Sequence, residues 1–187
     1  DPLDYSAVME NPAEFYMTAT DAATGRAAYF SKYDIIRDDY RTVMATCALP
    51  GFCRPVKVGE HFYYDGGVAD SIPLHHAIEQ GCTKMVVILS NPRDFVKKPE
   101  AHRPLYKHML HKYPKTIQSI DNRHINYQAS IDLACRLEKE GYVFIFAPSR
   151  HMPLSTFSKD AALEQDLYDL GVADYEARAE ELKYFLN

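Results

Sequence analysis

Aromatic and β-branched residues gather in short stretches that predict β-strands. Residues 14–20 and 26–30 have strand composition and are separated by turn residues, which predicts a hairpin with a loose turn. Residues 61–64 are mostly aromatic and are followed by glycines, so we expect a further strand that ends there. The apolar run 84–90 is uninterrupted, which is typical of a strand buried on both faces in a parallel sheet, and 142–147 is expected to be another buried strand.

Apolar residues recur at helical spacing in the remaining stretches. The predicted helices are 38–47, 73–80, 104–113, 116–140, 160–170 and 172–186. Ser71 is a candidate N-cap of the second helix, and Gly81 and Gly141 are expected to end the second and the fourth. Gly171 is expected to break the last stretch into two helices, with Ser158 as a candidate cap of the first of them.

The order of these elements indicates the fold class. The helix at 73–80 is followed directly by the buried strand at 84–90, and this order is typical of a parallel sheet covered by helices. With 187 residues, the chain is long enough to bury a sizeable core, as one large domain or one and a half. We therefore expect an α/β fold.

The stretch 63–73 combines the end of a strand with an acid and two glycines. Asp65 lies at the strand tip, and Gly66 and Gly67 are expected to take positive φ and to bring the backbone close to a neighbour. Such a turn leaves the Asp65 carboxylate facing a space that no side chain fills, which is how a loop presents a catalytic acid. The alternative is a surface turn, because Asp-Gly is a common turn dipeptide. A helix follows instead of a second strand, which favours a site over a hairpin turn.

Composition and charge narrow the function classes. The chain has 47% hydrophobic residues, an ordinary globular balance. Its formal net charge of -5, without a basic stripe, argues against nucleic acid as the main partner. The four cysteines show no C-x-x-C spacing, so they indicate neither a zinc knuckle nor a redox pair and are interpreted as reduced thiols of a cytosolic protein. The longest apolar runs have the length of strands and are far too short to cross a bilayer.

Several spaced motifs together resemble one protein family. They are Ala19-Thr20-Asp21 with Thr24-Gly25, the segment 45–52 (ATCALPGF), Tyr64-Asp65-Gly66-Gly67 with Ile72-Pro73, and the run 86–89. In this order they resemble the C-terminal half of a bacterial patatin-like phospholipase. The resemblance implies that residues 1–113 are part of a three-layer α/β/α hydrolase domain with a mainly parallel sheet, and that residues 114–187 are a largely helical C-terminal α/β extension.

The resemblance also implies a Ser-Asp dyad. In that family a serine in a G-x-S-x-G motif pairs directly with the Asp of an Asp-Gly-Gly motif. Asp65 would then be the general base that takes the serine proton during attack on an ester carbonyl, and that later activates water to release the acyl group. The residues implied for the substrate pocket are Gly66, Gly67, Leu49, Pro50 and Phe52. Packing alone would explain Leu49 and Phe52 equally well. The implied substrate is a lipid or another small ester, with no cofactor and no metal.

One part of the family pattern is absent from these residues. The eight glycines include no G-x-S-x-G motif and no Gly-Gly pair except Gly66-Gly67, so neither the serine nor a Gly-rich oxyanion loop is present. Because the chain also begins at Asp1 without Met, it is expected to be a piece of a longer protein. Without the serine and the oxyanion loop, it is expected to be inactive alone. The alternative is a non-catalytic α/β interaction module or a fragment of a pseudoenzyme. A G-x-S-x-G motif upstream of Asp1 would discriminate between them.

Further expectations concern partners and location. The chain is expected to be cytoplasmic, with peripheral contact to anionic lipid headgroups through basic residues, although a solvated face is the default interpretation. These residues are Lys97, Lys98, Lys107, His108, His111 and Lys112. His108 and His111 lie one helical turn apart, but no third ligand follows at metal-binding spacing, so they are interpreted as surface histidines. Half of a doubly wound domain should expose an apolar face, which favours a homodimer through that face.

Overall fold

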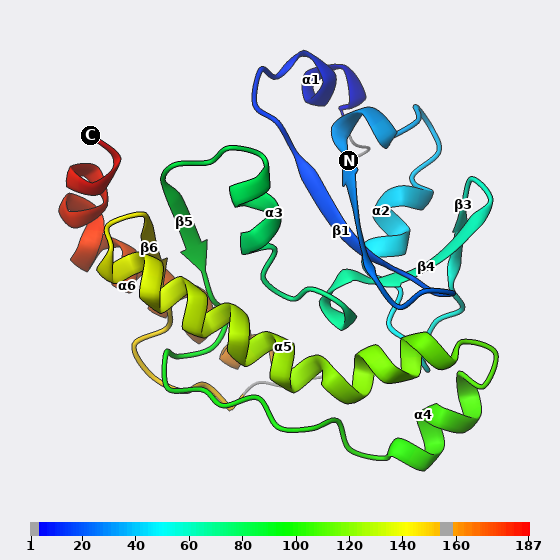
Figure 1. Cartoon of the computed structure of the whole chain (residues 1–187). Coiled ribbons are helices and arrows are strands. Elements are labelled where there is room, and N and C mark those ends of the chain that lie inside the picture. The colour runs from blue at the N-terminus through cyan, green and yellow to red at the C-terminus, as the bar shows by residue number, and fades with distance from the viewer. Residues whose placement is uncertain (1–3, 154–158) are drawn as a thin grey trace. The chain divides into compact units, whose positions relative to one another are not determined.

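The computed structural model describes residues 4–153 and 159–187. The chain divides into two compact units, whose elements are labelled in Figure 1. The first unit comprises Asp1–Pro73 and Lys97–Ala129, and the second comprises Leu74–Val96 and Ser130–Asn187. Both units contain helices and strands, so the chain is a mixed α/β protein, as expected.

A four-stranded antiparallel sheet is the framework of the first unit. Its strands are β1 (Tyr16–Asp21), β2 (Ala27–Ser31), β3 (Val56–Val58) and β4 (His61–Asp65), in the order β2-β1-β4-β3. β1 and β2 form the expected hairpin, in which Thr18 lies opposite Tyr29. β4 pairs with the other side of β1, where Ala19 lies opposite Asp65. The strand that ends at Asp65 is therefore a central strand of this sheet.

Short helices surround the sheet, and one of them is shorter than predicted. The helices of this unit are α1 (Tyr5–Glu10), η1 (Lys32–Asp34), α2 (Arg41–Thr46), η2 (Gly66–Val68), α4 (Arg103–Met109) and the first part of α5 (Pro114–Lys139). The prediction that the stretch 38–47 is helical throughout is wrong at its start. Asp38 has a φ of 63°, and Tyr40 is the N-cap, so α2 begins only at Arg41.

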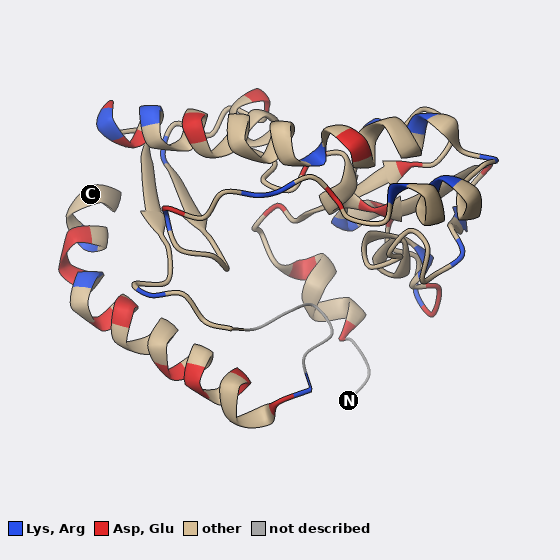
Figure 2. Cartoon of the chain, turned by 90° about the horizontal axis from the view of Figure 1, so that it is seen from below, with Lys and Arg blue, Asp and Glu red and all other residues tan. Residues whose placement is uncertain are grey.

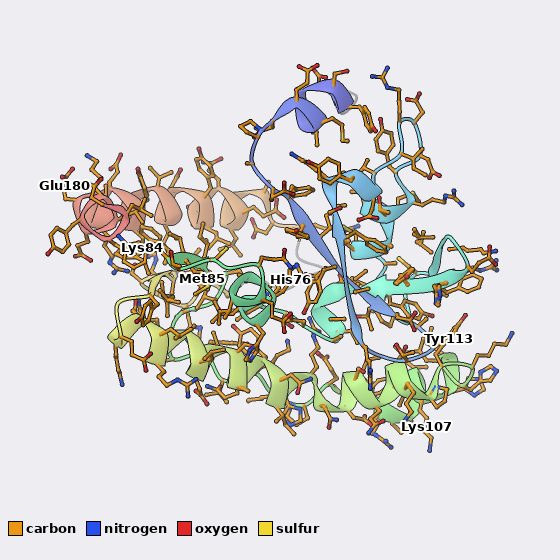
Figure 3. The ribbon with its side chains drawn as sticks, turned by 45° about the horizontal axis from the view of Figure 1, so that its top comes forward. His76, Lys84, Met85, Lys107, Tyr113 and Glu180 are labelled. Carbon is orange, nitrogen blue, oxygen red and sulfur yellow. The ribbon has the colours of Figure 1, made fainter. Side chains whose placement is uncertain are left out.

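The core of the first unit joins the sheet to α4 and α5. Its buried members are Ala22, Tyr64, Val68, Leu110, Ile117 and Ile120. The ring of Tyr64 also packs edge-on against that of Tyr113, which is labelled in Figure 3, with centroids 5.8 Å apart. Tyr64 is 3% exposed, so this aromatic pair anchors the start of α5 on β4.

Two hydroxyl groups of α5 bind the turn between β1 and β2. Thr116 Oγ1 donates to the carbonyl of Ala22 at 2.8 Å, and Ser119 Oγ donates to that of Gly25 at 2.7 Å. Gly25 has a φ of +68°, and a Cβ on it would lie 2.5 Å from the carbonyl oxygen of Lys115. Only glycine satisfies both the backbone conformation and the close approach of the helix.

The second unit contains a two-stranded parallel sheet and three helical segments. They are α3 (Leu74–Glu79), β5 (Met85–Ile88), the end of α5, β6 (Val143–Phe146) and α6 (Ala161–Leu186). β5 and β6 are parallel, with Met85 opposite Val143, as the uninterrupted apolar runs predict. Gly81 and Gly141 have φ of 84° and 83° and follow α3 and α5, which confirms them as helix ends.

The prediction that the strand at 84–90 is buried on both faces is wrong. Met85 and Val87 are buried, whereas Val86 is 39% and Ile88 is 80% exposed. Successive side chains of a strand point to opposite faces, and the described residues cover only one face of β5. β6, in contrast, is buried at Val143, Phe144 and Ile145.

The C-terminal stretch forms one helix, α6, and not the two predicted. It continues through Gly171, whose φ is not positive. A glycine inside a helix costs only about 1 kcal/mol relative to alanine, which helical packing readily offsets. The candidate cap Ser158 lies outside the described residues, and Asp160 is the N-cap, with its side chain accepting from the amides of Ala162 and Leu163.

Arginine side chains tie α5 and α6 to β6 in the second unit. Arg178 lies over the ring of Phe144, 4.3 Å from its centroid, and donates to the carbonyl of Ile145 at 2.7 Å. Arg93 donates to both carboxylate oxygens of Glu138 and to the same carbonyl. Acidic residues are spaced along the rest of α6 (Figure 2). No helix among the described residues is long and apolar enough to span a bilayer.

Candidate active site

Asp65 is the last residue of β4, and both of its backbone polar groups are bound. Its amide donates to the carbonyl of Ala48 at 2.9 Å, and its own carbonyl accepts from Thr20 Oγ1 at 2.8 Å. Thr20 Oγ1 also accepts from the amide of Ala69 at 3.2 Å. The backbone on either side of the Asp-Gly-Gly turn is therefore held by one buried hydroxyl.

The Asp65 side chain is half-buried and caps the helical turn η2. Its Oδ1 accepts a hydrogen bond from the amide of Gly67 at 2.7 Å. No hydrogen bond to Oδ2 occurs within residues 4–153 and 159–187. One carboxylate oxygen therefore fixes the orientation of the group, and the second remains available for proton transfer.

Gly66 and Gly67 make the turn for a different reason from the one predicted. Neither has a positive φ, so that part of the prediction is wrong. The predicted close approach is present, because a Cβ on Gly66 would lie 2.2 Å from the carbonyl oxygen of Thr18. The absence of a side chain, and not a left-handed conformation, is what position 66 requires.

Gly67 is held at its carbonyl as well as at its amide. Its carbonyl oxygen accepts from Ser71 Oγ at 2.8 Å and from Arg123 Nε at 2.6 Å. Ser71 is therefore used inside the turn, and the prediction that it caps the following helix is not supported by its geometry, because α3 begins at Leu74. Asp70 has a separate role, since its Oδ2 accepts from the hydroxyl of Tyr29 at 2.6 Å.

The segment 45–52 lies against Asp65 through the hydrogen bond to Ala48. Leu49 and Pro50 of this segment are half-buried, and Phe52 is 73% exposed. These three side chains stay predicted pocket residues, and Phe52 exposes the largest apolar surface that the structure reports for this segment.

The pKa values of two residues near the Asp-Gly-Gly turn, Tyr64 and Asp21, are shifted. Burial, and then the neighbouring Tyr113, raise the pKa of Tyr64 to about 12, so this hydroxyl keeps its proton at neutral pH. At the far end of the pairing with β1, burial opposes ionisation of Asp21, but hydrogen bonds from Thr24 and the charge of His61 lower its pKa overall. Asp21 is thus committed to the hairpin turn.

The described residues contain no cluster of three or more His, Cys, Asp or Glu side chains that would hold a metal ion. His108 and His111 are exposed, and Nδ1 of His111 lies 2.9 Å from the carbonyl oxygen of His108. This contact turns the His111 ring back toward the end of α4. The interpretation of these residues as surface histidines agrees with their exposure.

Arg123 is a residue that sequence reasoning missed. A basic residue on the polar side of a long helix has no sequence signal that separates it from a solvated one. A Cβ on Gly67 would lie 3.4 Å from Arg123 Nη2 and 3.1 Å from Asp65 Oδ1, so the guanidinium and the carboxylate flank the same small space.

Comparison with known families matches two separate parts of the chain. Residues 19–78 match the model of the family described as Patatin-like phospholipase. Residues 113–187 match a model described as Domain of unknown function (DUF6363). Asp65 and the segment 45–52 lie in the first match and Arg123 in the second. A search among curated proteins found no match. The first match supports the patatin-like family for the part of the chain that holds Asp65, and suggests a lipid acyl hydrolase.

Proposed function

We propose that this chain supplies the general base of a serine lipid acyl hydrolase of the patatin-like, phospholipase A or esterase type, and that the base is Asp65. The observation that carries the proposal is one half-buried carboxylate at the end of a central strand, oriented by the amide of Gly67 through a single oxygen. The family match over 19–78 supports the same assignment.

The chemistry assigned to Asp65 has two half-reactions, and in each of them the carboxylate takes up one proton and gives it back. As a serine oxygen attacks the ester carbonyl, Asp65 Oδ2 takes the hydroxyl proton, and the alcohol then leaves with that proton while an acyl-serine forms. Asp65 next takes a proton from water, which attacks the acyl-serine, and passes that proton to the serine oxygen as the free acid leaves. No step needs a metal or a cofactor, because the carboxylate alone exchanges the proton.

The substrate would be a lipid or another small ester. Gly66, Gly67, Leu49, Pro50 and Phe52 are proposed to line its pocket. The 73% exposure of Phe52 supports an acyl-chain wall, because exposed apolar surface gains from burial against an acyl chain. Within this proposal, residues 1–113 are part of a three-layer hydrolase domain, and residues 114–187 are the extension. Because β1 to β4 are antiparallel, a mainly parallel sheet in that domain would need further strands from elsewhere in the full-length protein.

The proposed location is the cytoplasm, with peripheral contact to membranes through α4. Leu105 and Met109, one turn apart, are 60% and 48% exposed, and the same stretch of chain carries the exposed Lys107 and Lys112. An amphipathic surface of this kind binds anionic lipid headgroups through its cations and the interface through its apolar side chains. Nucleic acid is not a proposed partner, because the net charge is -5.

A homodimer is proposed through the uncovered face of β5. Val86 and Ile88 supply its exposed apolar side chains. A non-catalytic α/β interaction module, or a pseudoenzyme fragment, is the alternative function. It is favoured by the absence of a G-x-S-x-G motif among these 187 residues.

Hydrolysis of a short-chain p-nitrophenyl ester tests the proposed function. This chain alone should not release p-nitrophenol above the buffer rate, because a base without a nucleophile forms no acyl-enzyme. The full-length protein that contains it should hydrolyse the ester and should lose that activity to a serine-directed fluorophosphonate. Fluorophosphonate-sensitive activity of the chain alone, or no activity of the full-length protein, would contradict the proposal.

A further inference from the structure

Arg123 is joined to the turn that carries Asp65. Its Nε donates to the carbonyl of Gly67 at 2.6 Å, while the amide of Gly67 donates to Asp65 Oδ1 at 2.7 Å. Both polar backbone groups of Gly67 are thus engaged, one by the helix α5 and one by the carboxylate. In Figure 1 the helical turn that follows β4 lies beside α5, where this contact is made.

A second contact holds the guanidinium from the opposite side. Arg123 Nη1 donates to Glu100 Oε1 at 2.9 Å, and the two side chains are 29% and 35% exposed. Lys97 Nζ lies 3.9 Å from the same oxygen of Glu100, and over the ring of Tyr127 at 5.7 Å. Two cations therefore share one carboxylate beside the Asp-Gly-Gly turn.

The environment of Lys97 disfavours its charged form. Burial, and then the charge of Arg123, lower the pKa of Lys97, and Glu100 offsets only part of this effect. The Arg123–Glu100 pair is partly exposed, and such pairs add little to stability, so its main structural effect is to hold the guanidinium against Gly67.

We propose that Arg123 is a positioning residue for Asp65, which holds the carboxylate in its reactive orientation by fixing Gly67. The inference rests on the proposed function of Asp65. It assigns to the segment matched by the model of unknown function a part in the site of the patatin-like segment, because Arg123 belongs to the former and Gly67 to the latter.

The geometry demands arginine and not only a positive charge. A guanidinium donates from Nε to Gly67 and from Nη1 to Glu100 at the same time, in a fixed plane. The ammonium of a lysine is a single point charge on a flexible stem and cannot hold both partners in that geometry. Arg123→Lys should therefore restore the charge and only part of the function.

The test compares Arg123→Gln, Arg123→Lys and a matched control in the full-length protein. The control is Arg103→Gln, because Arg103 lies in the same unit and, like Arg123, donates two hydrogen bonds, both of them to the carboxylate of Asp121 and none to the Asp-Gly-Gly turn. Three quantities are measured for each variant: the melting temperature, the hydrogen exchange of peptides covering 64–70, and kcat and KM for a p-nitrophenyl ester.

Arg123→Gln should speed exchange of the Gly67 amide and lower kcat about tenfold or more with little change in KM, since small displacements of a catalytic group cost this much. Arg123→Lys should lie between it and the wild type. Arg103→Gln should leave kcat and the exchange of 64–70 unchanged at a similar melting temperature. Unchanged exchange and kcat in Arg123→Gln, or equal effects of Arg103→Gln, would overturn the positioning role.

If Asp65→Asn itself retains turnover, the proposed function fails instead, and the exchange result still decides whether Arg123 holds the turn.

Discussion

Thr20 and Asp65 are joined by a buried hydrogen bond, from the Thr20 hydroxyl to the Asp65 carbonyl at 2.8 Å. Thr20 is 0% exposed, and the same oxygen accepts from the amide of Ala69 at 3.2 Å. A side chain of β1 therefore closes the loop between the end of β4 and the residue after η2. The proposed base is held by the hairpin strand as well as by its own turn.

Replacing Thr20 by valine should weaken this link. Valine has nearly the same shape but no hydroxyl, so the carbonyl of Asp65 and the amide of Ala69 would lose a partner in a buried place. The free energy of unfolding should fall by about 1–3 kcal/mol, measured by urea denaturation. Thr20→Ser keeps the hydroxyl and is the control. Equal stability of the valine variant and the wild type would show that the link is unimportant.

Replacing Gly66 by alanine should strongly reduce the stability of the fold. The new Cβ would lie 2.2 Å from the carbonyl oxygen of Thr18, and the backbone of a central strand cannot move aside cheaply. A loss of about 1–3 kcal/mol or more in unfolding free energy is expected. A Cβ on Gly67 would meet only side-chain atoms, Asp65 Oδ1 at 3.1 Å and Arg123 Nη2 at 3.4 Å. Gly67→Ala should therefore be more stable than Gly66→Ala. The reverse order in a thermal melt would contradict the described turn.

The hairpin and the position of Asp65 could be predicted from local composition. Strand-forming residues flank Thr24-Gly25, and an aromatic run leads up to Asp65. In both places the tertiary structure agrees with the local preference for strands. The predicted close backbone approach at position 66 is confirmed, whereas the predicted positive φ is wrong. Composition alone does not show whether a glycine is needed for its missing side chain or for a left-handed conformation.

Features that depend on distant segments could not be predicted. Arg123 contacts Gly67 across 56 positions, and nothing in the local sequence of α5 separates it from a solvated residue. The exposure of Ile88 depends on which segments cover β5, which an apolar run cannot indicate. Gly171 destabilises a helix by only about 1 kcal/mol relative to alanine. The favourable interactions of the continuous helix α6 outweigh this cost.

The Arg93–Glu138 pair should make the stability of the second unit depend on acid pH. Hydrogen bonds from Arg93 lower the pKa of Glu138 below its ordinary value of 4.5, although burial opposes this. The folded state thus favours the carboxylate, so its stabilisation is present above about pH 4.5 and is lost as the pH falls through the lower folded pKa.

Glu138→Gln should therefore lower the melting temperature at neutral pH and flatten its decline below pH 4.5. Glu140→Gln, an exposed residue on the adjoining loop, changes the net charge equally and is the control. A Glu138→Gln profile parallel to that of the wild type across this range would mean that the pair contributes nothing to the pH dependence.

Ester turnover of Asp65→Asn in the full-length protein tests the assignment of the base most directly. Asparagine keeps the size of the side chain and the hydrogen bond from Gly67, but its amide cannot accept the serine proton. Asp70→Asn is the matched control, because Asp70 is also half-buried and bound to a neighbour, the hydroxyl of Tyr29. Turnover of Asp65→Asn should fall by about two orders of magnitude or more at an unchanged melting temperature, while Asp70→Asn stays within a few-fold of the wild type. Turnover of Asp65→Asn within a few-fold of the wild type would contradict the proposed mechanism and leave the Asp-Gly-Gly turn a structural element.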